Sequence, residues 1–130
     1  MSEIDGIGPD APTYENEDGG KQSDSPYRFD LIPERALFEV ARVFKEGAEK
    51  YGEDNWHKIP VHSQLNHALQ HQYAHLAGDE QDEHLIHAAC RALMALEVHL
   101  MEKEQIERNS LDLKRIVREV KGRSHMKVKC

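Results

Sequence analysis

The sequence predicts an all-α protein, a four-helix bundle that is completed by oligomerisation. Apolar residues recur at steps of three and four along most of the chain, and glycines end the periodic runs. No stretch alternates with period two for long enough to be a strand. The 130 residues, 38% hydrophobic and 32% charged, have the size and composition of one globular domain. Four short helices leave a small core, so we expect partner subunits to complete the burial.

The two ends of the chain differ in charge. Residues 1–26 carry seven acidic residues against one lysine, with four glycines and three prolines, and should be a flexible segment. Residues 27–104 should be the helical core. Residues 105–130 should form a C-terminal helix and a basic tail, because nine Lys or Arg face four acids from residue 103 onward.

The first two helices are bounded by recognisable signals. Pro33 fits the first turn of a helix that runs to Tyr51 and Gly52. A polar stretch, residues 53–60, then contains the only tryptophan. Ser63 can cap a second helix, which Gly78 should end. The apolar side of this helix is formed by Leu65, Ala68, Leu69 and Leu76.

A third helix should begin near Asp79 and Asp82, because negative charge is favoured at a helix start, and continue to about Glu104. Its apolar positions are Leu85, Ala88, Ala89, Ala92, Leu93 and Leu96. Asn109-Ser110 predicts the start of a fourth helix, and Gly122 predicts its end. The stripe of this helix is Leu113, Ile116, Val117 and Val120.

Several classes of protein are disfavoured. The longest apolar stretches are too short for a membrane span, and no secretory signal is recognisable, so we expect a cytoplasmic protein that does not enter a membrane. Two cysteines, Cys90 and Cys130, make no disulfide framework or zinc cluster. A net charge of −7 argues against nucleic-acid binding.

Histidines and carboxylates carry the chemical signal. Eight of the nine histidines lie between residues 57 and 99. One face of the second helix holds His67, His71 and His75, and one face of the third holds His84, His87 and Arg91. On two helices packed as a hairpin, such imidazoles can converge on a metal or a phosphate.

Two acidic pairs add oxygen ligands. Glu46 and Glu49 are three residues apart on the first helix, and Asp79 and Asp82 repeat that step before the third. Clustered carboxylates suit Mg²⁺ or Mn²⁺, which bridge polyphosphate oxygens. Each pair alone would also be ordinary on a protein surface.

A string of short motifs resembles phage-type dATP/dGTP diphosphohydrolases, relatives of the MazG and HisE all-α nucleotide pyrophosphatases. The resemblance covers about residues 27–100 and is nearest to the MazZ branch, from phages that replace adenine by 2-aminoadenine. It rests on Gly47-Ala-Glu-Lys50-Tyr51-Gly52, Asn55-Trp56, Leu65-Asn-His-Ala-Leu69, His71, Ala77-Gly-Asp79 and Asp82-Glu-His84-Leu-Ile-His87-Ala. It implies a MazG-like bundle, assembled as a dimer or tetramer, that uses divalent metal.

The chain departs from the superfamily hallmark, a Glu-x-x-Glu pair followed by Glu-x-x-Asp. Glu46 and Glu49 match the first pair, whereas the second would be Asp79 and Asp82, at a longer separation than usual. In an up-down bundle these pairs lie at opposite ends. A second subunit, a different placement of the second helix, or histidines replacing part of the hallmark would resolve this. An alternative alignment starts from Trp56.

The alternative alignment puts His71, His84 and His87 where relatives carry carboxylates, and both alignments stay open. The resemblance implies hydrolysis of a purine nucleoside triphosphate, dGTP first among them, to the monophosphate and pyrophosphate. Its expected catalytic residues are Glu46, Glu49 and Asp82. Its expected ligands for Mg²⁺ or Mn²⁺ are Glu46, Glu49, His71, Asp79, Asp82, His84 and His87. Its expected substrate contacts are Lys50, Asn55, Trp56 and Arg91.

Two other functions fit parts of the pattern. A non-catalytic helical module that binds a nucleotide or a protein would explain the departures from the hallmark. An HD-type triphosphohydrolase fits the histidine excess, although no histidine is followed directly by aspartate.

Overall fold

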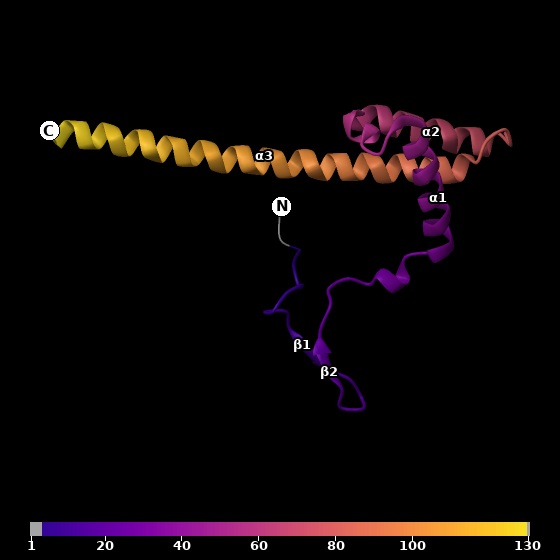
Figure 1. Ribbon diagram of the computed structural model, residues 1–130, viewed down its shortest axis with the longest axis horizontal. Helices are drawn as coiled ribbons and strands as arrows, with labels where there is room; N and C mark the ends of the chain where they lie inside the picture. Colours follow the sequence, from indigo (N-terminus) through magenta and orange to yellow (C-terminus); the bar gives the residue numbers. More distant parts are fainter. Residues whose placement is uncertain (1–3, 130) are drawn as a thin grey trace. The chain divides into compact units, whose positions relative to one another are not determined.

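A computed structural model describes residues 4–129 and divides the chain into two compact units, one ending at Phe38 and the other beginning at Glu39. The elements in chain order are β1 (Thr13–Glu15), β2 (Lys21–Ser23), a 3₁₀ turn η1 (Phe29–Leu31), α1 (Glu34–Tyr51), a 3₁₀ turn η2 (Asn55–Lys58), α2 (Val61–Leu76) and α3 (His84–Lys129). The protein is therefore mainly helical, as predicted (Figure 1).

The first unit contains a small antiparallel hairpin, so the expectation that the chain forms no strand is wrong here. β1 pairs with β2 so that Glu15 lies opposite Lys21, an attractive cross-strand pair. The connecting turn is held by the Asn16 side chain, whose Oδ1 accepts the backbone N–H groups of Asp18 and Gly20 at 3.0 and 2.8 Å. The strands are three residues long and exposed, too short to show an alternating pattern in the sequence.

In the second unit, α2 and α3 form an antiparallel hairpin, and the part of α1 from Glu39 onward crosses it (Figure 1). Val40 and Val43 of α1 pack with Cys90 of α3, and partly buried Phe44, Ile86 and Met94 surround them. Gly52 ends α1 and Gly78 ends α2, both with positive φ (95° and 82°) that favours glycine. The sequence predicted both ends correctly.

The predicted caps around α2 and α3 are wrong in detail. α2 begins at Val61 after Pro60, so Ser63 lies inside its first turn and caps nothing. α3 begins at His84, which places Asp79 and Asp82 in the preceding loop. The Asp79 and Asp82 side chains accept the backbone N–H groups of Gln81 and Glu83 at 3.2 and 2.8 Å, and thereby hold this loop.

The predicted third and fourth helices are one helix, so the described chain has three α-helices and not four. Asn109 and Ser110 do not interrupt α3, because Gln105 donates to the Asn109 side chain at 2.9 Å and Arg108 pairs with Glu104 across one turn. Gly122 is also helical; a single helical glycine costs only about 1 kcal/mol. The C-terminal part of α3 extends well past the first turn of α2 (Figure 1).

The predicted apolar stripes contribute less to the core than expected. Ala68, Ala88, Ala95 and Val98 are buried between the helices of the second unit, whereas the larger leucines remain exposed. Leu76 is 79% exposed and Leu96 is 52% exposed. Small side chains let the helices approach closely, and the leucines then lie outside the contact. Within residues 4–129, no helix is both long and apolar enough to cross a membrane.

Candidate active site

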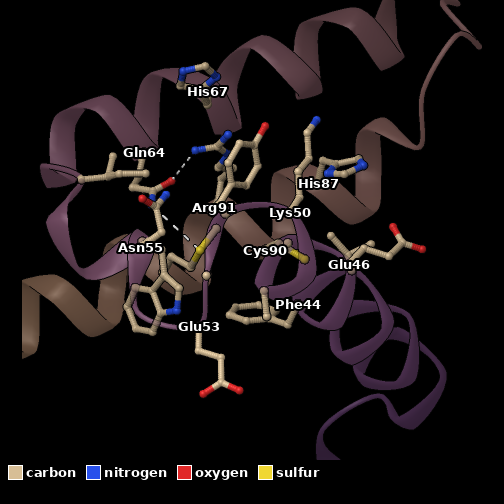
Figure 2. A pocket seen from close by; sticks show the side chains of 18 of the residues that line it. Phe44, Glu46, Lys50, Glu53, Asn55, Gln64, His67, His87, Cys90 and Arg91 are labelled. Carbon is tan, nitrogen blue, oxygen red and sulfur yellow. Dashed lines mark hydrogen bonds between the residues drawn. The ribbon is translucent and has the colours of Figure 1, made fainter.

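An open cavity of about 610 Å³ lies in the second unit (Figure 2). Its walls are formed by the last turns of α1, by η2, by α2 and by the first half of α3. Ligand pockets for small molecules have volumes of this order, and a nucleotide fits such a space. Eight of the residues predicted to bind metal or substrate line it: Glu46, Lys50, Asn55, Trp56, His71, Asp82, His87 and Arg91. Since α1 crosses the hairpin, Glu46 and Asp82 line one pocket within a single chain.

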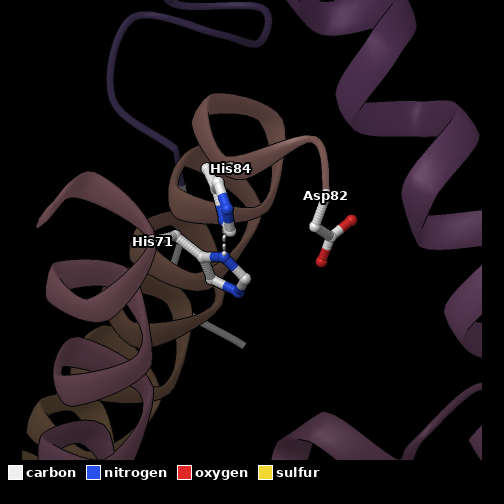
Figure 3. A group of neighbouring side chains, drawn as sticks. All are labelled: His71, Asp82 and His84. Carbon is white, nitrogen blue, oxygen red and sulfur yellow. Dashed lines mark hydrogen bonds between the residues drawn. The ribbon is translucent and has the colours of Figure 1, made fainter. Parts of the chain in front are cut away.

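A group of metal-ligand type adjoins this cavity: His71 and Asp82 line the cavity, and His84 lies behind it. His71 of α2, Asp82 of the loop and His84 of α3 each offer a ligand atom, and these atoms lie within 4.8 Å of one another (Figure 3). The Nδ1 atoms of His71 and His84 face each other at 2.9 Å. One of two imidazole nitrogens at this distance donates a proton to the other, so a single cation could bind both lone pairs only after that proton is lost.

Asp79 and His87 surround this group. Nε2 of His84 donates to Oδ2 of Asp79 at 2.5 Å, which fixes the tautomer and leaves Nδ1 of His84 as the acceptor. Nε2 of His87 lies 3.2 Å from Oδ1 of Asp82, and the His87 ring stacks on His71 with centroids 5.2 Å apart. Five of the seven predicted metal residues are therefore linked by these contacts: His71, Asp79, Asp82, His84 and His87.

Local charges favour the forms that bind a cation. Burial, and then the charges of His87 and His84, lower the pKa of His71, so its imidazole is more readily neutral. The hydrogen bond from His84 lowers the pKa of Asp79, and the backbone N–H of Glu83 lowers that of Asp82. Neutral imidazoles and ionised carboxylates are the forms that metal coordination requires.

Only one residue of the first acidic pair, Glu46 and Glu49, faces the cavity. Glu46 lines the cavity, but its Oε1 accepts from Arg42 at 2.9 Å, and Arg42 also binds Glu39 and Glu83 at 2.7 and 2.8 Å. Glu49 is exposed and is not among the residues that line the cavity. A three-residue step turns two side chains about 60° apart around a helix, so only one of this pair faces the pocket. Asp79 and His84 likewise lie behind the main cavity, on a shallower hollow.

The two predicted phosphate-binding cations both face the cavity. Nη1 of Arg91 donates to Oε1 of Gln64 at 2.9 Å, and the Lys50 ammonium lies 5.0 Å from the centre of the Tyr51 ring. Among the described residues, neither cation has a carboxylate oxygen within 4.0 Å. Their positive charge is therefore available to an anion.

The predicted base contacts lie at the η2 side of the cavity. Trp56 packs edge-on against Phe44, with ring centroids 6.4 Å apart, and stacks on His57 at 3.8 Å. Its ring therefore has a packing role, and its partial exposure leaves an edge on the cavity. Asn55 lines the cavity beside it (Figure 2).

Sequence reasoning missed Gln64, which lies fully buried in the wall of the cavity. Its position, four residues before Ala68, was the available signal, because that spacing places it on the packed face of α2. Glu53 also lines the cavity and was not singled out. Of the three histidines expected on one face of α2, His67 and His71 line the cavity, whereas His75 contributes only to the shallower hollow.

Comparison with known proteins identifies a family. Residues 16–108 match the family model described as dATP/dGTP diphosphohydrolase, N-terminal. No curated protein and no solved structure matches the chain.

Proposed function

Because this chain belongs to the dATP/dGTP diphosphohydrolase family, we propose that it hydrolyses a purine deoxynucleoside triphosphate, dGTP in the first instance, to the monophosphate and pyrophosphate. The observation that carries the proposal is the set of side chains around one cavity. A metal-ligand group adjoins the cavity, an indole edge lies near η2, and two cations line it that have no carboxylate oxygen within 4.0 Å among the described residues. A nucleoside triphosphate needs these three kinds of contact.

The donor atoms fit a divalent cation. His71, His84 and Asp82 would hold it, with Asp79 orienting His84 from behind. Imidazole nitrogen suits transition metals better than Mg²⁺, whereas carboxylate suits both, so this set favours Mn²⁺. When bound, such an ion would offset phosphate charge and polarise the attacking water.

The remaining steps belong to the side chains of the cavity. Water attacks the α-phosphorus, the bond from that phosphorus to the bridging oxygen breaks, and pyrophosphate leaves. Glu46, the carboxylate on the α1 wall, would accept the proton of the water. Lys50 and Arg91 would offset the charge of the leaving pyrophosphate, and Asn55 and Trp56 would contact the base.

Product analysis tests this proposal. Incubated with dGTP and Mn²⁺, the protein should give dGMP and pyrophosphate, and excess chelator should abolish turnover. His71→Ala and Asp82→Asn should lose most of the activity while circular dichroism stays unchanged. His62→Ala, an exposed histidine on the same helix and outside the cavity, is the matched control and should retain it.

The other outcomes identify the alternatives. Deoxyguanosine and triphosphate as products would contradict the pyrophosphatase reaction and indicate the HD-type chemistry that a histidine-carboxylate cluster also permits. Binding of dGTP without turnover would indicate a non-catalytic nucleotide-binding module. The preference for dGTP over dATP stays a prediction, which the same assay with both nucleotides tests. The nearer likeness to the MazZ branch also stays a prediction.

A further inference from the structure

Gln64 is the one polar side chain that the described part of the protein buries completely, at 0% exposure. A buried amide is costly unless both its ends find partners. Its Oε1 accepts from Nη1 of Arg91 at 2.9 Å, and its Nε2 lies 3.9 Å from the sulfur of Met94, a weak acceptor. The strong contact is therefore the one to Arg91, which joins α2 to α3 (Figure 2).

Arg91 differs from the arginines that form ion pairs in the described part of the chain. Arg42 binds three carboxylates, and Arg28, Arg108, Arg115 and Arg123 each have one within 4.0 Å. Arg91 is instead held by a neutral amide. An amide orients a guanidinium by a hydrogen bond, as a carboxylate does, but leaves the positive charge uncancelled.

The position of Arg91 on α3 places its positive charge at the cavity. Arg91 follows His87 by four residues on α3, so both side chains lie on the face that lines the cavity. Among the described residues, Gln64 engages only Nη1 of the guanidinium, so the other N–H groups can donate to an anion in the cavity. Lys50, on the α1 wall, offers a second charge, and within the described residues no hydrogen bond fixes it as Gln64 fixes Arg91.

We infer that Gln64 is a positioning residue, which holds Arg91 in the cavity wall as an uncancelled cation for the polyphosphate of the substrate. The inference rests on the proposed function, since it names what Arg91 would bind. It explains why a buried glutamine occupies this site: a glutamate of the same size would cancel the charge, and an apolar residue would leave the guanidinium without its orientation.

Two variants separate charge from orientation. Gln64→Glu keeps the size and the hydrogen bond but adds a negative charge that pairs with Arg91. Gln64→Met keeps the approximate size without a strong acceptor and without a new charge. Gln72→Glu is the matched control, because it makes the same chemical change at an exposed position of α2 outside the cavity.

The experiment measures binding of inorganic tripolyphosphate by titration calorimetry in the presence of Mn²⁺, and KM and kcat for dGTP. Gln64→Glu should weaken tripolyphosphate binding and raise KM by about tenfold or more, because Arg91 contacts the phosphates in the ground state as well. Gln64→Met should show a smaller effect in the same direction. Gln72→Glu should match the unaltered protein.

The outcomes separate this inference from the function on which it rests. Unaltered protein that neither hydrolyses dGTP nor binds tripolyphosphate would overturn both. If the unaltered protein does both, and both Gln64 variants bind tripolyphosphate as tightly as Gln72→Glu, then Gln64 serves packing alone and the inference is wrong. Loss of stability in urea with unchanged KM has the same meaning. Should Gln64→Glu fail to fold, Gln64→Met decides the question.

Discussion

At the scale of single residues, the cavity depends on side chains that orient other side chains. Asp79 fixes the tautomer of His84, Gln64 holds Arg91, and Arg42 holds Glu46. In each case a group outside the expected reaction determines where a functional group points. The free energy of such contacts is modest, but their geometry decides which lone pair or N–H faces the cavity.

The Asp79 contact gives a prediction about metal affinity. Asp79→Asn replaces an acceptor that holds Nε2 of His84, so Mn²⁺ affinity should fall by about tenfold. His84→Ala removes a proposed ligand and should weaken binding further. Calorimetric titration with Mn²⁺ measures both, with Asp112→Asn on the exposed part of α3 as the control of equal charge.

Equal Mn²⁺ affinity in Asp79→Asn, His84→Ala and Asp112→Asn would contradict a metal site at this group. The acidic residues of α1 would then be the better candidates, and Glu46→Gln would be the variant to titrate next.

At the scale of elements, two glycines show why some helix ends are readable in a sequence and others are not. Gly78 follows α2 and adopts φ of 82°, which satisfies the last carbonyls of the helix through the N–H groups of Gly78 and Asp79. Gly122 lies in α3 with helical backbone. A glycine permits a left-handed conformation at a helix end but does not require it. The sequence alone therefore does not distinguish Gly78 from Gly122.

Substitution by alanine should distinguish these glycines. Gly78→Ala forces a side chain into a left-handed conformation and should lower the free energy of unfolding by about 1 kcal/mol. Gly122→Ala adds a methyl group that meets nothing within 4 Å beyond its chain neighbours and its own helical backbone, so it should not destabilise the helix. Urea denaturation followed by circular dichroism measures both. Equal midpoints for the two variants would contradict the different roles assigned to them.

At the scale of the second unit, the exposed leucines are the main unexplained surface. Leu93, Leu96 and Leu100 recur at steps of three and four on α3 and are 46%, 52% and 48% exposed. An apolar stripe of this kind on a small core is typical of a face that a second copy covers. This observation supports the oligomer predicted from the sequence, which stays a prediction.

Sedimentation should therefore give a mass well above that of one 14.9 kDa chain at micromolar concentration. Leu96→Glu places a charge in the stripe and should shift the protein toward the monomer. Leu111→Glu, on the part of α3 beyond α2 and 66% exposed, is the control and should leave the mass unchanged. A mass of one chain for the unaltered protein would contradict the oligomer.

The sequence by itself determined the helical class, the glycine ends of α1 and α2, and eight of the residues that line the cavity. Helical periodicity and glycine are local signals, and histidines spaced by four must share a face. Short motifs also identified the family before any geometry was known.

Only the tertiary structure decided how these pieces meet. The crossing of α1 over the hairpin brings Glu46 and Asp82 to one cavity and turns Glu49 away. The continuity of α3, the burial of Gln64 and the exposure of the leucines likewise depend on packing between segments far apart in the chain. Local pattern fixes which side of a helix a residue occupies, but the neighbouring helix determines which side is covered.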